Sequence, residues 1–136
     1  MNTVLFACVH NAGRSQMAAA FFNRLADPAK ARAISAGTQP GAEVYPEVRQ
    51  VLHEVGIDLD VPKPRLLTLE VARQASVLIT MGCGEACPVV PGVKRQDWPL
   101  TDPKGQPLPI VREVRDAIRV RVEELIQAEG WGWGAP

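Results

Sequence analysis

The sequence is poor in the features that mark several large classes of protein. Fifteen basic and fifteen acidic side chains cancel, so nothing favours a broad surface for nucleic acid or for an anionic membrane. The longest apolar opening run, residues 4–9, is far shorter than the ~20 residues of a membrane-spanning helix and has no basic lead-in. We therefore expect a cytoplasmic protein that binds neither nucleic acid nor membrane.

Cysteine is also scarce. Three cysteines are an odd number and too few for a secreted disulfide scaffold, so they are reactive, metal-bound or simply buried. The chain of 136 residues has the length of one domain, which we place at residues 1–129 with a tail at 130–136. The tail has no periodicity, and we expect it to be frayed or draped on the surface.

Apolar runs and helical patterns alternate along the chain, which predicts an α/β domain with a four-stranded, mostly parallel sheet and helices on both faces, in three layers. Residues 4–9 read as the central strand. Further strands are expected at 31–36, 76–81 and 93–98, and helices at 16–25, 44–55, 68–74 and 110–128. Ser15 and Thr68 are expected to cap helices, and the Ser15 hydroxyl could also donate to a Cys8 thiolate. In the last helix, Arg112/Asp116 and Arg119/Glu123 are expected as exposed pairs four residues apart.

The loop after the first strand has the composition of an anion site. In parallel sheets ligands bind beyond the carboxyl ends of the strands, and a short loop into a helix lets backbone amides converge at the positive end of the helix dipole. Arg14 offers a planar guanidinium suited to a tetrahedral oxyanion. Cys8 lies at the base of this loop, where the same groups stabilise a thiolate, so we interpret it as a nucleophile rather than a buried apolar residue. The oxyanion-binding residues are expected to be Val9, His10, Asn11, Ala12, Gly13, Arg14 and Ser15.

Residues 8–17, Cys-Val-His-Asn-Ala-Gly-Arg-Ser-Gln-Met, resemble the phosphate-binding loop of low-molecular-weight protein tyrosine phosphatases and of the arsenate reductases built on the same fold. The Arg-Ser-Gln-Met ending is more similar to the reductases. The resemblance extends through residues 35–37, the second cysteine segment and Asp102-Pro103. The resemblance implies that Asp102 is the general acid. An Asp-Pro pair is also common in turns, so the dipeptide alone does not establish this role.

The second cysteine segment favours the reductase branch, since a phosphatase needs only one thiol. Cys83 is the candidate to attack a sulfur bound to arsenic, and Cys87 can carry the disulfide outward by thiol–disulfide exchange. By resemblance to thioredoxin-coupled arsenate reductases, the thiols act in the order Cys8, Cys83, Cys87, and thioredoxin reduces the last pair. No bound cofactor is implied, and phosphate or sulfate would mimic arsenate.

Other interpretations of the cysteines stay open. Cys8, His10, Cys83 and Cys87 could supply four zinc ligands, although their spacing is not typical, and Cys83 and Cys87 could be inert. Some family members hold potassium through a carboxylate on the first helix, but Ala19 stands there, so we expect no required metal. A phosphatase that uses Cys8, Arg14 and Asp102, a reductase linked to glutathione or glutaredoxin, and an oxyanion-binding or redox-sensing module are the alternative functions. We expect a monomer.

Overall fold

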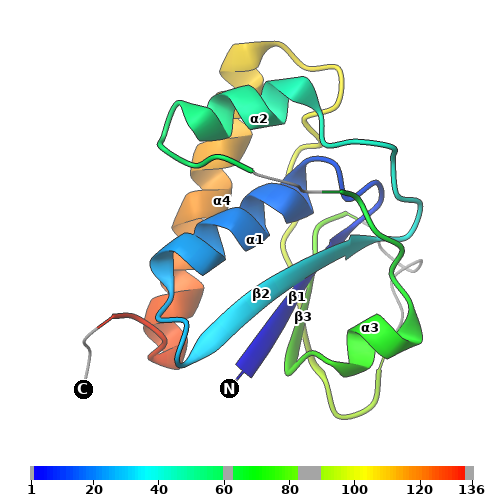
Figure 1. Ribbon diagram of the computed structural model, residues 1–136, viewed down its shortest axis with the longest axis vertical. Coiled ribbons are helices and arrows are strands. Elements are labelled where there is room, and N and C mark those ends of the chain that lie inside the picture. Colours follow the sequence, from blue (N-terminus) through cyan, green and yellow to red (C-terminus); the bar gives the residue numbers. More distant parts are fainter. Residues whose placement is uncertain (1, 60–62, 83–89, 134–136) are drawn as a thin grey trace.

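The computed structural model describes residues 2–59, 63–82 and 90–133, which form one parallel sheet covered by helices (Figure 1). The strand order is β2-β1-β3-β4, and every neighbouring pair is parallel, so β1 lies inside the sheet as expected. The expected fold class is confirmed. The elements in chain order are β1 (Asn2–Cys8), α1 (Arg14–Leu25), β2 (Ala31–Gly37), α2 (Pro46–His53), α3 (Leu69–Arg73), β3 (Val77–Thr80), β4 (Lys94–Asp97) and α4 (Leu108–Glu129).

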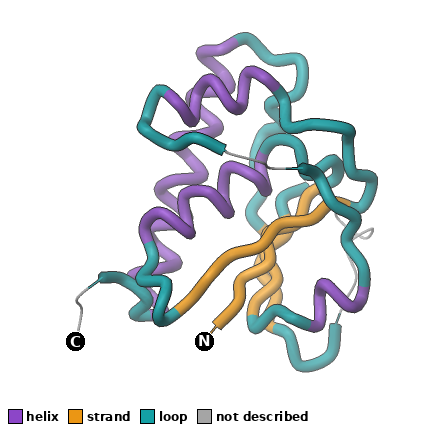
Figure 2. The backbone as a smooth tube through the Cα atoms, viewed as in Figure 1, coloured by secondary structure: helices purple, strands orange, loops and turns teal. Residues whose placement is uncertain are grey.

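Both faces of β1 are buried, which explains its continuous apolar sequence. Val4 and Phe6 point into the larger part of the core, where Phe6 packs edge-on against Phe22 of α1 with ring centroids 6.1 Å apart. Leu5 and Ala7 point to the other face. Helices α1 and α4 cover the first face, α2 packs beside α4, and the short α3 covers the second (Figure 2). None of the helices described is long and apolar enough to cross a membrane.

The sheet brings the carboxyl ends of three strands to one edge. Cys8 at the end of β1 lies beside Gly37 at the end of β2, and Ala7 lies beside Thr80 at the end of β3. The chain runs from β1 to β2 on one side and later to β3 on the other, so the order reverses next to β1. Such a reversal opens a crevice at the strand ends, where ligands bind in open α/β sheets.

The predicted cap of the first helix is wrong. Helix α1 begins at Arg14 with Gly13 as its N-cap, and no side chain bonds to that cap. The Ser15 hydroxyl lies within the first turn and contacts the Cys8 sulfur and the Asn11 amide instead. The cap of α3 is confirmed, since the Thr68 hydroxyl accepts a hydrogen bond from the Val71 amide at 3.1 Å.

The expectation of a frayed or draped tail is wrong for Trp131. Its side chain is buried and packs edge-on against Phe22, with ring centroids 5.8 Å apart. Helix α4 ends at Gly130, whose φ of 72° is left-handed and turns the chain back toward α1. The core therefore includes a residue beyond the expected domain end.

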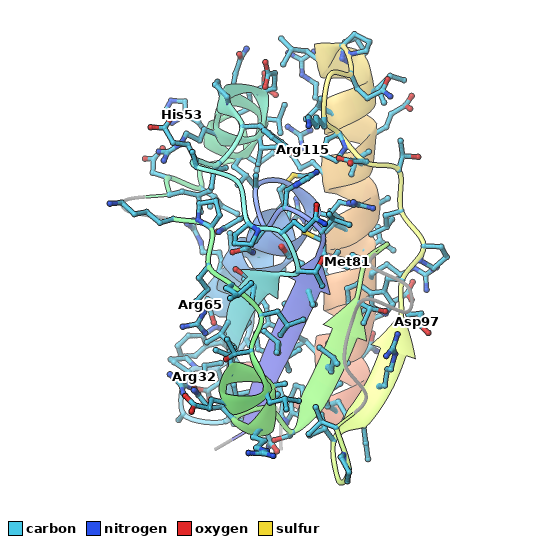
Figure 3. All side chains as sticks on the ribbon, turned by 90° about the vertical axis from the view of Figure 1, so that its right-hand side faces the viewer. Arg32, His53, Arg65, Met81, Asp97 and Arg115 are labelled. Atoms are coloured by element: carbon cyan, nitrogen blue, oxygen red, sulfur yellow. The ribbon has the colours of Figure 1, made fainter. Side chains whose placement is uncertain are left out.

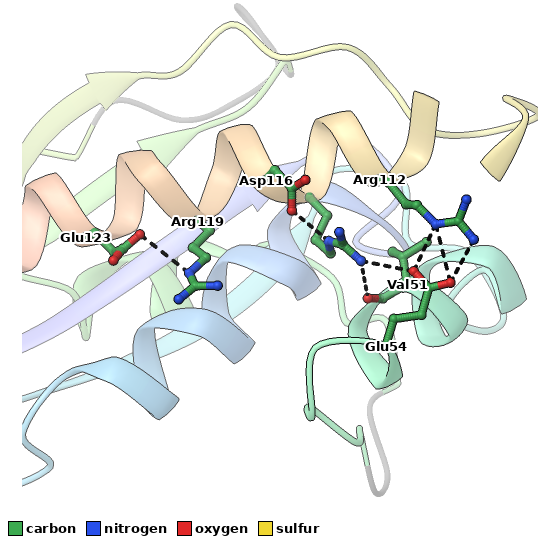
Figure 4. Close-up of polar contacts among 7 residues, drawn as sticks. Val51, Glu54, Arg112, Asp116, Arg119 and Glu123 are labelled. Carbon is green, nitrogen blue, oxygen red and sulfur yellow. Dashed lines mark hydrogen bonds and ion pairs between the residues drawn. The ribbon is translucent and has the colours of Figure 1, made fainter. Parts of the chain in front are cut away.

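Helix α2 is held against α4 by an ionic cluster centred on Glu54 (Figure 4). Arg112 donates to the Glu54 carboxylate at 2.8 Å, and Arg115 donates to it at 3.0 Å and to the Val51 carbonyl at 2.8 Å. The expected Arg112–Asp116 pair is wrong, because Asp116 pairs with Arg115 at 2.8 Å and Arg112 turns across to α2. A buried guanidinium with three acceptors fixes the position of α2.

The second expected pair of α4 is confirmed: Arg119 and Glu123 lie 3.5 Å apart on the exposed face. A pair of this kind adds little stability because both side chains are solvated. The cluster around Glu54 is the more specific link between helices.

We predict that the Glu54 cluster stabilises the protein only above acidic pH. The hydrogen bond from Arg112 holds the pKa of Glu54 below its ordinary value of 4.5. A lowered pKa in the folded state means that the stabilisation is complete above the unfolded value and is lost as pH falls through the folded one. In urea titrations, E54Q should therefore be less stable than the wild type at neutral pH, with the gap closing as pH falls through the lowered folded value. E124Q, which alters an exposed carboxyl of α4, is the control, and a gap that stays constant with pH would contradict this account.

Candidate functional site

The loop after β1 turns its carbonyl groups outward onto the segment that follows β2. The Thr38 amide donates to the Cys8 carbonyl, and the other pairs are Gln39 to Val9, Gly41 to His10 and Tyr45 to Ala12, over 2.8–3.2 Å. In a trans peptide the carbonyl and the next amide point in opposite directions. The amides of residues 9, 10, 11 and 13 therefore point away from this segment.

None of the amides of residues 9–15 donates to a backbone carbonyl within the described part of the chain. These donors stand at the start of α1, where the helix dipole places partial positive charge. Unpaired amides at a helix start form a binding site for a tetrahedral anion. The loop that the sequence indicated thus has the backbone geometry of an oxyanion cradle.

Arg14 is buried beside this cradle and held from two sides. Its Nη1 donates to the Leu100 carbonyl at 3.1 Å, and its Nη2 lies 3.6 Å from an Asp102 carboxylate oxygen. Gly82 at the end of β3 packs against the same guanidinium, with a left-handed φ of 97°, and any side chain there would overlap Nη1. The two contact residues Leu100 and Gly82 give no motif that sequence reasoning could detect.

Cys8 is almost fully buried, with 3% of its surface exposed, and its sulfur lies 2.9 Å from the Ser15 hydroxyl. The Asn11 side-chain amide donates to that hydroxyl at 2.7 Å. A hydrogen bond to the charged form of a thiol favours the thiolate. The structure therefore gives Cys8 a polar neighbour as well as a place beneath the loop amides.

His10 lies on the outer side of the loop. Its Nδ1 is 3.0 Å from the Gln39 carbonyl, which can only accept, so this ring nitrogen is the donor. The ring therefore binds the segment that follows β2. The same segment also donates a hydrogen bond from the Gly41 amide to the His10 carbonyl. This contact supports the shape of the loop.

Asp102 stands at the rim of the site with 44% of its side chain exposed. One carboxylate oxygen faces Arg14 and the other accepts a bond from the Lys104 amide at 3.0 Å. The next residue, Pro103, packs so closely on Gly13 that a β-carbon on Gly13 would lie 2.8 Å from it. The Asp102 segment thus closes over the anion loop, as a general acid requires.

Tyr45 belongs to the site and was missed by the sequence analysis. Partial burial raises the pKa of Tyr45, the negative charges of Asp102 and Cys8 raise it further, and Arg14 opposes the change. The phenol therefore stays protonated in the neutral range. Its ring edge lies next to Gly13, so Tyr45 forms a wall of the cradle. A lone tyrosine ahead of a helix carries no sequence signal for this role.

Cys83 and Cys87 lie outside the described residues, so the expected thiol series is described only at Cys8. The chain reaches Gly82 from β3, whose side chains Leu78 and Ile79 are buried on opposite faces of the sheet. Met81, the residue between β3 and Gly82, donates its amide to the Ala7 carbonyl at 2.7 Å, and Figure 3 places its side chain near the carboxyl ends of the strands. No group of three or more possible metal ligands occurs in the part that the structure describes.

Known proteins share this arrangement. The sequence matches the family described as low molecular weight phosphotyrosine protein phosphatase over residues 3–129. It is 39% identical over 126 residues to a putative arsenate reductase of Halobacterium salinarum, and the alignment covers 88% of this chain and 87% of that relative. It is 36% identical over 129 residues to a glutaredoxin arsenate reductase of Synechocystis sp., covering 93% of this chain and 97% of the relative.

A solved structure extends the similarity to three dimensions. A thioredoxin-dependent arsenate reductase of Corynebacterium glutamicum superposes with a TM-score of 0.83 at 38% identity. The match covers 94% of this chain and 61% of that protein, so this chain spans about three fifths of that relative's length.

We predict that Gly82 is required for anion binding because its backbone packs on Arg14. In G82A the added methyl group overlaps the Arg14 guanidinium and displaces it. Loss of one charge-assisted hydrogen bond from Arg14 to inorganic phosphate should weaken phosphate binding by about 10- to 100-fold. G92A is the matched control, since Gly92 has a similar φ of 82° and nothing within 4 Å of the added carbon. Calorimetric titration measures both, and equal affinities in the two variants would refute this role.

Proposed function

We propose that this chain, which belongs to the low molecular weight phosphotyrosine protein phosphatase family, is an arsenate reductase. In this proposal three thiols act in series as a relay. The observation that carries the proposal is the position of Gly82. This residue directly precedes Cys83 in the sequence and packs on Arg14, within the same anion site as Cys8. The sequence therefore continues from a residue that packs on Arg14 into a segment with two further thiols, and a phosphatase has no use for these thiols.

The first step is attack on arsenic. Arsenate binds to the amides of residues 9–15 and to Arg14, and the Cys8 thiolate attacks the arsenic atom from below. An S–As bond forms, and one oxygen leaves as water after Asp102 supplies a proton. The contact between Asp102 and Arg14, 3.6 Å, supports this assignment, because it places the acid at the mouth of the cradle.

The second step reduces arsenic. The Cys83 thiolate attacks the Cys8 sulfur, the S–As bond breaks, and its electron pair stays on arsenic, which leaves as arsenite. Cys87 then attacks the Cys83 sulfur, which releases the Cys8 thiolate and forms a Cys83–Cys87 disulfide. The parallel pairing of β1 with β3 supports this series, since it brings the ends of the two strands together.

Thioredoxin is the proposed reductant of the final disulfide. Cys8 is buried, so a protein reductant could not reach a disulfide that stayed at Cys8, and a third thiol solves this by carrying the disulfide outward. The relay needs reduced thiols at rest, which fits the cytoplasm. The similarity to both a thioredoxin-dependent and a glutaredoxin enzyme makes the reductant the point to test first.

A phosphatase is the second candidate function. Cys8, Arg14 and Asp102 suffice to form and hydrolyse a cysteinyl-phosphate, and the family itself is named for this chemistry. In that case the thiols at 83 and 87 would have no part in turnover. A weak phosphatase activity alongside arsenate reduction agrees with the first proposal.

We predict that serine variants of the three cysteines stop the reaction at different steps. With arsenate, thioredoxin, thioredoxin reductase and NADPH, C8S should show no arsenate-dependent NADPH oxidation, because no S–As bond forms. C83S should release no arsenite but still bind oxyanion. C87S should give one arsenite per protein and then stop with a Cys8–Cys83 disulfide, which thiol-state mass spectrometry detects.

Hydrolysis of p-nitrophenyl phosphate is the internal control for these variants, since C83S and C87S should keep any such activity and C8S should lose it. Normal cycling of C87S with thioredoxin would refute the relay and favour a glutaredoxin acting directly on Cys83. If arsenate never drives NADPH oxidation while the ester is hydrolysed, the phosphatase proposal replaces the first.

We also predict that Asp102 acts in the first step only. D102N cannot donate the proton, so arsenite formation in a single turnover should slow by about 100- to 10,000-fold, the range of general acid catalysis. Reduction of a preformed Cys83–Cys87 disulfide by thioredoxin should be unchanged, and this serves as the control. A normal single-turnover rate in D102N would remove Asp102 from the mechanism.

A further inference from the structure

Gln16 follows Ser15 in α1, and its side chain is buried at the base of the anion loop. Its Nε2 donates to two oxygens of the same residue, the Asn11 carbonyl at 3.1 Å and the Asn11 side-chain oxygen at 3.2 Å. No step of the proposed mechanism uses Gln16. A buried amide that binds both oxygens of one loop residue restrains that residue strongly.

We propose that Gln16 is a positioning residue that fixes Asn11 so that the Ser15 hydroxyl donates its proton to the Cys8 thiolate. The inference rests on the proposed role of Cys8 as nucleophile. The two hydrogen bonds of the Gln16 side chain both go to Asn11, so its effect on the sulfur passes through Asn11 and Ser15.

Two backbone groups, the Asn11 carbonyl and the Arg65 amide, fix the direction of these hydrogen bonds. The Asn11 carbonyl can only accept, so Gln16 presents its NH₂ group to Asn11. The Arg65 amide can only donate, and it lies 3.0 Å from the Asn11 side-chain oxygen. The oxygen of the Asn11 amide therefore faces Arg65 and Gln16, and the nitrogen faces Ser15.

This orientation decides what Ser15 does. The Asn11 nitrogen donates to the Ser15 oxygen at 2.7 Å, so one lone pair of that oxygen is occupied and its proton is free for another acceptor. The sulfur of Cys8, 2.9 Å away, is that acceptor. If the Asn11 amide rotated, its NH₂ group would face two N–H donors, and Ser15 would lose the bond that orients it.

Gln16 also holds Asn11 in an uncommon backbone conformation. Asn11 has a φ of 50°, and it is the one residue other than glycine with a positive φ among those described. The left-handed region is less favourable for residues with a β-carbon than for glycine, although asparagine adopts it more readily than most, so hydrogen bonds to Asn11 help to hold this conformation. Gln16 holds the main chain and the side chain of Asn11 together, which the single bond from Arg65 does not.

The test is a double-mutant cycle on the thiolate itself. Variants Q16M, S15A and the two combined are made in a C83S/C87S background, so that Cys8 is the sole thiol. The ultraviolet absorbance of the thiolate and the rate of alkylation by iodoacetamide are followed against pH. Loss of the oriented hydrogen bond should raise the pH midpoint in Q16M by about half a unit to one unit.

The same substitution should have almost no further effect in the S15A background, because Gln16 acts through that hydroxyl. Q50M, on the exposed face of α2, is the matched control and should leave the midpoint unchanged. A midpoint that does not move in Q16M, or that moves equally with and without Ser15, overturns the proposal.

Two further readings separate this proposal from its alternatives. Thermal unfolding shows whether Q16M is folded, and Q16L, which is uncharged and lacks both N–H donors, is the second variant if it is not. For Q16L the same coupling to S15A is expected. Since the titration contains no arsenate, it stays informative if the chain proves to be a phosphatase, and absence of arsenate reduction then counts against the proposed function alone.

Discussion

The site depends on one set of hydrogen bonds, in which backbone amides of the segment after β2 donate to the carbonyl groups of the loop after β1. Peptide planarity converts this outward pairing into an inward row of amides. Gly37 shows how tight the fit is, since a β-carbon there would lie 2.6 Å from the Val9 carbonyl. The two parallel strands β1 and β2 must therefore end in register before the loop can bind an anion.

Around this cradle the polar groups have defined orientations. Arg14 is placed by a backbone carbonyl, a carboxylate and the backbone of Gly82, so its planar group has little freedom. Ser15 is oriented by Asn11, and Asn11 by Gln16 and a backbone amide. Preorganisation of this kind matters because charge develops on the bound oxyanion during attack, and groups already in place need no rearrangement at that moment.

The elements could be predicted from sequence because each has a local signal. The apolar run of β1, the Thr68 cap and the long amphipathic pattern of α4 are read residue by residue, and so is the Cys8–Arg14–Ser15 spacing. The failures concern partners distant in the chain. Arg112 pairs with Glu54 rather than within its own helix, and Trp131 packs against Phe22 in the core. Tyr45 and Gly82 enter the site only through the fold, so no local pattern marks them.

The contact of Gly82 with the Arg14 guanidinium has a thermodynamic consequence. Gly82 directly precedes Cys83 in the sequence, and its backbone packs on the guanidinium of Arg14, which we propose as a ligand of the anion. A displacement of Gly82 that moves Arg14 would change oxyanion affinity, and by reciprocity a bound oxyanion would change the population of the displaced state by the same factor. Occupancy of the cradle and the position of the Gly82 backbone are in this way linked in a single equilibrium.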